Sequence, residues 1–462
     1  MQVDYVCRAF VHVQSGEEDP LKNNLVGALM LACLCAGTTA QAYAQDREKS
    51  AELRLDEVIR LAVERSPEVE GAQHTIRAME HRVPQARTLP DPSVSVGWAG
   101  KPVPFDTMSG DASSYRGFTV SELFPYPGKL RLQGEMATRD VTAAQADCEA
   151  SRRRIVLGAR LAFAEYFYLD KAIEATHRNK ELLEKLAQIA EAQYRVGKAM
   201  QPDVLRAQLE ISMLMEKLTM LEQQRDTAIT DLNAALQQAP ETPLGKPAPL
   251  EQSRIGKELG ELYALAEAHD TGLERGDASI ERGKLGVALA ERQRRPDVNV
   301  SYMFQQRTNQ PAMHGVTVSV TVPVFQKSRQ QEAIAEAAES LAAAGRMQAN
   351  QRTAVRAEVR RQYVAAQAAE RLLTLYAKGI VPQSALTLES AMSAYQVGKG
   401  DFNSVIGSFS AELNYETGYY RQLADHEIAV ARIEALTGEP ITTDSAQTLT
   451  ESGDFGAAKG AL

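Results

Sequence analysis

The amino-acid sequence predicts a mixed, mainly α-helical chain built from two tandem repeats, each giving two β-strands and long coiled-coil helices. Three observations predict this fold class. Short motifs recur in the same order about two hundred residues apart. Proline-free stretches with heptad spacing run far beyond the length of an ordinary globular helix. Strictly alternating segments precede those stretches. The repeats carry the most weight, because they set the architecture of the whole chain.

The first 44 residues indicate a secretory signal peptide. An apolar run from Leu25 to Ala36 follows Lys22 and leads to Ala42-Tyr43-Ala44, the basic, apolar and small-residue order of an exported chain. A buried core helix is the alternative. The acidic run Glu17–Asp19 is unusual in such a segment, and a start codon further along would explain it. Met30-Leu31-Ala32-Cys33 also resembles a lipoprotein cleavage box, so lipidation of Cys33 stays open.

Composition excludes several classes of protein. The net charge of -9 and the lack of a basic run with interleaved aromatic residues argue against nucleic acid as a partner. No apolar run after residue 44 reaches the length of a membrane helix. The processed chain keeps only Cys148, which cannot form an intrachain disulfide. The sequence contains no H-E-x-x-H, phosphate-loop or G-x-S-x-G motif. We therefore predict no enzyme activity, no metal site and no cofactor.

Four pairs of motifs define the repeats. The pairs are Ala192–Lys198 with Ala394–Lys399, Leu55–Ala62 with Leu259–Ala266, Pro90-Asp91 with Pro296-Asp297, and Gly117–Ser121 with Gly315–Ser319. A proline-rich connector separates the two copies. The predicted segments in order are opening helices 45–88, β-hairpin 89–127, helical hairpin 128–239, connector 240–257, opening helices 258–294, β-hairpin 295–325, helical hairpin 326–438 and a flexible tail 439–462.

The predicted strands alternate between apolar and small polar residues. Ser93–Trp98, Val298–Gln305 and Val316–Val322 keep this period of two throughout, whereas the strand from Phe118 loses its phase at Glu122. One apolar and one polar face suit either a half-buried sheet of a soluble protein or a membrane barrel with lipid outside and water inside. The pattern alone leaves both open.

The long helices are predicted from heptads. In the first copy, Leu161 to Val196 gives an apolar residue every seven positions, and Val204 to Ala235 follows an a/d pattern broken only by Arg225. Sustained heptads need partner helices to bury the seam. Gly197 suits the left-handed end of one helix, and Pro202-Asp203 suits the start of the next. We expect hairpin tips at 197–203 and 398–404. In the second hairpin Pro382 should kink or break the helix. An apolar stripe still follows there, formed by Phe402, Ile406, Phe409, Leu413, Tyr420, Leu423 and Val430.

Closure of such a chain requires more than one copy. Four short strands are too few to close a membrane barrel, and open sheet edges cannot face lipid. Three copies would supply a 12-stranded transmembrane β-barrel, together with a helical tube, the periplasmic α-barrel.

With these motifs in place, the sequence resembles the TolC family of outer-membrane efflux proteins. The resemblance rests on the duplicated order, the Tyr-x-Val-Gly-Lys tips with Asp203-Val204-Leu205 following, and the helix Leu55–Ala62. Leu89–Pro92 and Phe124–Leu130 are similar to the branch that exports heavy-metal cations. The resemblance implies an outer-membrane channel reaching into the periplasm. The channel would be the passive exit duct of a tripartite efflux system.

The family also implies partners and a site. The partners are two further copies in a homotrimer, outer-membrane lipid, a periplasmic adaptor (a membrane fusion protein) and an inner-membrane resistance-nodulation-division pump. The implied tip and adaptor contacts are Gly197, Asp203, Val204, Leu205, Gly398 and Asp401. Asp203 and Asp401 are candidate gate residues, because three copies of each would form a negative ring. The alternative is that Asp203 only caps its helix.

Two other functions remain in view. A periplasmic adaptor would have a single helical hairpin flanked by small β domains, and the tandem units disfavour it. A soluble coiled-coil scaffold would use the strands as an ordinary sheet. Location in a membrane fraction separates both from the channel.

Overall fold

The computed structural model describes residues 52–100, 113–307 and 310–442. The chain divides into two compact units, and the described part of the smaller unit joins residues 52–54 to Thr242–Ala248. There the backbone N–H of Leu53 donates to Lys246 O at 2.8 Å, and the N–H of Ala248 donates to Leu53 O at 2.8 Å. The larger unit holds all the described helices and strands. The predicted signal peptide and Cys33 lie outside the described residues.

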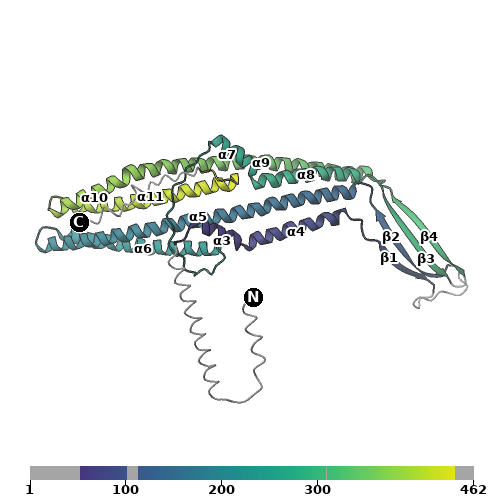
Figure 1. Cartoon of the computed structure of the whole chain (residues 1–462), viewed down its shortest axis with the longest axis horizontal. Coiled ribbons are helices and arrows are strands. Elements are labelled where there is room, and N and C mark those ends of the chain that lie inside the picture. Colours follow the sequence, from purple (N-terminus) through teal and green to yellow (C-terminus); the bar gives the residue numbers. More distant parts are fainter. Residues whose placement is uncertain (1–51, 101–112, 308–309, 443–462) are drawn as a thin grey trace, which may run out of the picture. The chain divides into compact units, whose positions relative to one another are not determined.

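The larger unit runs through the same order of elements twice (Figure 1). The first copy contains α3 (Leu55–Glu64), α4 (Pro67–Arg87), β1 (Ser93–Ala99), β2 (Tyr115–Phe124), α5 (Lys129–Arg195) and α6 (Gln201–Ala235). The second contains α7 (Leu259–His269), α8 (Thr271–Arg292), β3 (Asp297–Arg307), β4 (Gln310–Thr321), the π-helical turn η1 (Gln326–Gln330), α9 (Gln331–Leu375), the π-helical turn η2 (Tyr376–Ile380), α10 (Val381–Gln396) and α11 (Phe402–Thr437). None of the described helices combines the length and apolar character needed to cross a bilayer.

The four strands form one antiparallel sheet in the order β1-β2-β3-β4. The two copies of the repeat meet at the β2–β3 pair, where Phe118 lies opposite Phe304. Strands β1 and β4 are the edges of this sheet within the described chain. Each edge therefore presents a row of backbone groups without a strand partner there.

The register sorts the sheet into two faces. Residues directly opposite one another share a face, so Val94, Val120, Tyr302 and Val316 form one apolar row. Ser121, Ser301 and their neighbours Ser93 and Thr317 form a polar row, and the Ser93 and Ser121 hydroxyls lie 2.8 Å apart. Strand β2 continues two residues past Glu122, whose side chain falls on the apolar face opposite Val300. The alternation in β2 is therefore broken at Glu122 because a charged side chain takes an apolar position, and the strand does not end there.

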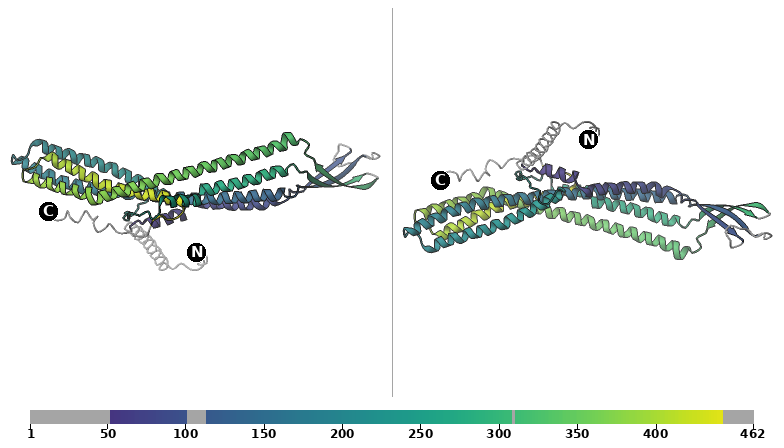
Figure 2. Two further views of the ribbon diagram at one scale, coloured as in Figure 1. Left: turned by 90° about the horizontal axis from the view of Figure 1, so that it is seen from above. Right: turned by 90° about the horizontal axis from the view of Figure 1, so that it is seen from below.

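Helix α5 has 67 residues, about 100 Å at the α-helical rise, and organises the helical body. On the sheet side the packing order is α4, α5, α8, α9, and on the tip side it is α6, α5, α11, α10. Figure 2 shows these helices side by side from opposite directions. Each order is an open row, because within the described chain neither α4 with α9 nor α6 with α10 makes more than a marginal contact.

The core on the tip side follows the predicted stripes, with one correction. Buried residues of α6 and α11 include Ala207, Leu214, Phe402, Phe409 and Leu413, as the apolar patterns predicted. In α5 the seven-residue row is only partly right. Leu161, Leu182 and Ile189 are half-buried and Val196 is exposed, while Phe163, Leu183 and Leu186 are fully buried. A helix with neighbours on several sides buries a broader stripe than one heptad seam.

Two further expectations need correction. Pro382 does not break its helix, because the backbone stays helical from α9 through η2 into α10, and the proline occupies the first turn of α10. A π-helical turn shifts the hydrogen-bond pattern where the proline lacks its N–H.

The tail also begins later than residue 439, since Ile441 is fully buried and its N–H donates to Glu434 at 3.1 Å. Residues 443–462 lie outside the described chain.

Candidate functional site

The first hairpin tip is the short turn between α5 and α6. Gly197 has a φ of 75°, in the left-handed region that favours glycine. The N–H of Lys198 donates to Gln193 O at 2.9 Å, which satisfies a carbonyl at the helix end. The second tip repeats this geometry with Gly398 at a φ of 73° and Lys399 donating to Ala394 O at 2.9 Å. The repeated Val-Gly-Lys motif therefore encodes a backbone turn.

The two candidate gate aspartates both serve as helix caps. The backbone N–H of Met200 donates to the Asp203 carboxylate at 3.4 Å, from the position just before α6. The N–H of Ser404 donates to the Asp401 carboxylate at 3.3 Å, and Asp401 is the N-cap of α11. Both carboxylates also sit at the positive end of their helix. Asp401 is exposed and Asp203 is half-buried.

These two aspartates do not occupy equivalent positions in the repeat. The glycine pair fixes the offset, which makes Met200 equivalent to Asp401 and Asp203 equivalent to Ser404. The first copy carries its acid at the third helical position, and the second copy carries it at the cap itself. Each hairpin thus keeps one carboxylate at the start of its second helix. The carboxylate of the first copy lies about one helical turn further along than that of the second copy.

The two tips pack together within one chain. The Gln193 side-chain amide donates to Gln396 O at 3.4 Å. Tyr395 is buried, and its ring centroid lies 5.2 Å from that of Phe402. Burial, and then the negative charge of Asp203, raise the pKa of Tyr395. Asp203 of the first tip therefore lies near Tyr395 of the second.

Tyr395 is a tip residue whose role the sequence did not reveal. Its repeat partner Tyr194 is 45% exposed, whereas Tyr395 is 4% exposed. The motif predicted only that the two tyrosines match. Which of them is covered depends on the neighbouring helix, and no local pattern reports that.

The outer surface of the tips is apolar. Val204 is half-buried against the core, but Leu205 is exposed. Val196, Met200 and Val397 are also exposed. An exposed apolar group around a tight turn is a surface suited to contact with another protein. We call Val196, Met200, Leu205 and Val397 the tip surface.

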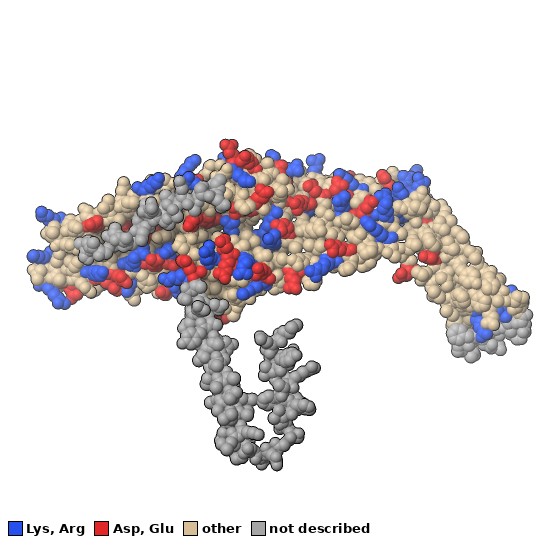
Figure 3. Space-filling view, viewed as in Figure 1, with Lys and Arg blue, Asp and Glu red and all other residues tan. Residues whose placement is uncertain are grey.

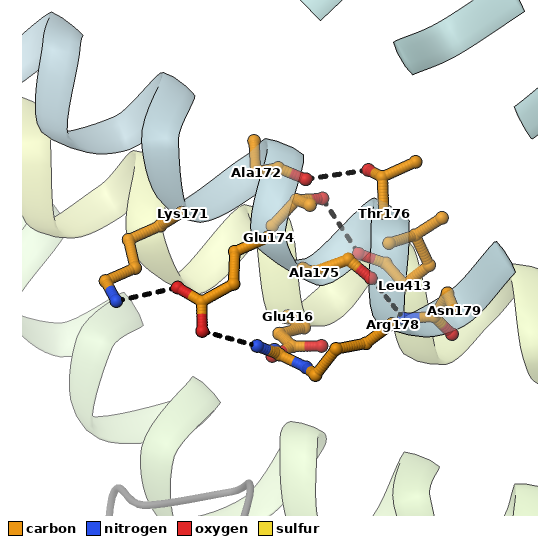
Figure 4. Close-up of polar contacts among 10 residues, drawn as sticks. Lys171, Ala172, Glu174, Ala175, Thr176, Arg178, Asn179, Leu413 and Glu416 are labelled. Carbon is orange, nitrogen blue, oxygen red and sulfur yellow. Dashed lines mark hydrogen bonds and ion pairs between the residues drawn. The ribbon is translucent and has the colours of Figure 1, made fainter. Parts of the chain in front are cut away.

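A charged network fixes α5 against α11 (Figure 4). Glu174 accepts from Lys171 at 2.9 Å and from Arg178 at 2.9 Å, and Arg178 also donates to Glu416 of α11. The Glu416 side chain is 4% exposed, and that of Arg178 is 37% exposed. A buried carboxylate without its cation is costly, so this pair favours one register of the two helices.

The two motifs that resemble the cation-exporting branch meet at the junction of helices and strands. Thr88–Asp91 and Leu130 line one cleft. Asp297, at the start of β3, accepts from the Tyr126 N–H at 2.6 Å and from the Lys129 ammonium at 2.8 Å. Gly128 has a φ of 94° beneath the Arg292 side chain. These contacts give Phe124–Leu130 a structural role, in which it joins the first copy to the second.

Comparison with known proteins agrees with this architecture. Residues 58–237 match the outer membrane efflux protein family. The predicted resemblance to the TolC family is confirmed. The description of that family places its proteins in the outer membrane. The same description calls the members efflux proteins. No curated protein matches the chain.

Several solved outer-membrane channels share the TolC-type fold. VceC from Vibrio cholerae is 17% identical, with a TM-score of 0.72, over 84% of this chain and 96% of that one. CmeC from Campylobacter jejuni is 12% identical, with a TM-score of 0.72, over 85% and 87%. The open state of MtrE from Neisseria gonorrhoeae is 14% identical, with a TM-score of 0.70, over 84% and 89%. At these identities the likeness concerns the fold.

Proposed function

We propose that three copies of this TolC-type chain form a passive exit duct, the outer-membrane channel of a tripartite efflux system. The observation that carries the proposal is the four-stranded sheet with two open edges and one apolar face. Val94, Val96, Val316 and Val318 on the edge strands are exposed. A sheet of this kind is stable in a bilayer only when its edges pair with further strands. Three sheets give twelve strands, an even number within the usual range for such barrels.

The helical flanks support the same assembly. On α6 the exposed residues Leu205, Leu209, Met213 and Met220 form a stripe nearly opposite the one that packs on α5. At the other end of the row, Leu375, Leu386 and Val397 are exposed at eleven-residue spacing. Packing the α6 flank of one copy on the α9–α10 flank of the next would cover both stripes and close a helical tube.

Partners are proposed from the tips. The tip surface, with Gly197, Val204 and Gly398 beside it, would bind a periplasmic adaptor, which links the duct to an inner-membrane resistance-nodulation-division pump. The exposed apolar side chains support a protein contact there.

Heavy-metal cations are the proposed substrate, on the similarity of Leu89–Pro92 and Phe124–Leu130 to the cation-exporting branch. The structural role of the second motif weakens its value as a signature of substrate. The pump would make the choice of substrate in either case. Export assays with a panel of metal salts and organic toxins, in cells lacking the chain, test this part separately.

Asp203 and Asp401 are proposed to line the closed end of the duct. Because each carboxylate also caps a helix, Asp203→Asn keeps a cap oxygen and removes only the charge. A negative ring attracts cations, so the variant should conduct cations less selectively in planar bilayers. Unchanged conductance and selectivity in Asp203→Asn and Asp401→Asn would discard the gate and leave the caps.

The assembly itself is tested by expressing the chain and fractionating the cells. We expect a heat-modifiable trimer in the outer membrane that conducts in planar bilayers. A well-behaved monomer purified without detergent would refute the duct and favour a periplasmic adaptor or a coiled-coil scaffold.

A further inference from the structure

A basic patch lies where the second copy passes from helices into strands. Arg294 and Arg295 precede β3, and Lys327 and Arg329 follow β4, all four with exposed side chains. Asp297 pairs with Thr321, so both segments lie at the same end of one β-hairpin. Neither 292–296 nor 322–331 contains an acidic residue, although the whole chain carries a net charge of -9. Figure 3 shows Lys and Arg gathered near this junction.

Exposed apolar residues lie directly between this patch and the sheet. Val322, Val324 and Phe325 are all exposed and stand between the end of β4 and Lys327. In the space-filling view, the part of the sheet next to the junction is nearly free of charged side chains (Figure 3). Apolar residues followed at once by lysine and arginine are the order found where a membrane protein leaves the hydrocarbon layer.

The first copy has a different arrangement at the corresponding place. Lys129 is bound to Asp297, and Arg131 is paired with Glu135 at 2.5 Å. These two basic residues therefore have acidic partners within the chain.

We propose that Arg294, Arg295, Lys327 and Arg329 bind the headgroups of anionic phospholipids in the periplasmic leaflet of the outer membrane. The patch supplies charge complementary to lipid phosphate, at about 1 kcal/mol for each basic residue near an anionic surface. Val324 and Phe325 enter the adjoining acyl region. This inference rests on the proposed assembly, which places the sheet in the bilayer and the helices outside it.

The test compares purified full-length trimers in nanodiscs. Wild type, the variant R294Q/R295Q/K327Q/R329Q and the control R60Q/R65Q/R152Q/K185Q, altered at exposed residues of the helical body, are melted in dioleoylphosphatidylcholine with and without dioleoylphosphatidylglycerol. We expect the anionic lipid to raise the Tm of wild type and control, and the rise to be at least halved in the patch variant. Conductance in neutral lipid should be the same for all three proteins.

An equal rise in the patch variant would overturn the proposal, as would an equal rise when inorganic phosphate replaces the anionic lipid. If all three proteins form conducting trimers without any effect of the anionic lipid, the lipid site is refuted and the duct stands. If none forms a conducting trimer, the duct itself is refuted.

Discussion

The Arg178–Glu416 pair allows a quantitative prediction. In Arg178→Met the Glu416 carboxylate, only 4% exposed, loses the guanidinium that donates to it from α5. Breaking a buried pair by removing one partner costs about 3–5 kcal/mol. Arg178 itself is 37% exposed, so water partly screens the pair. We therefore expect the free energy of unfolding to fall by about 3 kcal/mol per chain, the lower end of that range. Scaling an unfolding entropy of about 2.1 cal/mol/K per residue to this chain gives a Tm lower by about 3 °C.

Substitution of the other partner, Glu416, should lower the free energy of unfolding by less. In Glu416→Gln the Arg178 guanidinium still pairs with Glu174 at 2.9 Å and with water, so we expect a loss of about 1 kcal/mol. The double variant should be more stable than Arg178→Met alone, because it removes the buried negative charge together with its cation. This non-additivity is the signature of a desolvated pair.

The assay is thermal unfolding of the detergent-solubilised protein, followed by helical circular dichroism at one fixed chain concentration. Arg195→Met is the matched control. Arg195 pairs with Glu191 one helical turn away, as Arg178 does with Glu174, but both side chains of the control pair are exposed. That control should lose less than about 0.5 kcal/mol. Equal losses in Arg178→Met and Arg195→Met, or simple addition in the double variant, would refute the reasoning.

Two further predictions concern the sheet and the pH dependence. A Cβ on Gly117 would lie 1.9 Å from the Phe304 carbonyl oxygen, so Gly117→Ala should sharply reduce the yield of heat-modifiable trimer, whereas Gly97→Ala on β1, with open space around it, should not. Burial, and then the charge of Glu416, raise the pKa of Tyr420 to about 12, against about 10 in the unfolded chain. The neutral phenol therefore contributes stability below pH 10 that is lost as the pH rises toward 12. Melting curves across that range should show a smaller loss in Tyr420→Phe, and an unchanged loss would contradict the assignment.

Elements with a strong period could be predicted from the sequence. The alternation of Val316–Val322 and the stripe from Phe402 to Leu413 each report which side of an element is apolar, and the structure agrees. The site was harder, because its properties depend on contacts between distant segments. Glutamate is usually a surface residue, and Glu416 is buried only because α11 packs against α5.

The junction residues illustrate the same limit. Phe124–Leu130 was recognised as a motif and interpreted through the family that carries it. Tyr126 and Lys129 of this motif contact Asp297, which lies 171 and 168 positions further along the sequence. A single sequence contains no local signal for such a pair. Motif resemblance therefore predicted the likeness to a family correctly, but it did not predict what the motif does.

The displaced aspartates show which features of the repeat the fold requires. Both tips keep glycine in the left-handed conformation, since another residue there would be strained. Both helices keep a carboxylate for their first N–H groups, but one supplies it from the cap and the other from three residues later. A helix start needs an acceptor within reach and does not fix its position in the sequence. Capping alone therefore explains why each tip has one acid. A gate additionally requires the charge, which the asparagine variants remove while keeping the acceptor.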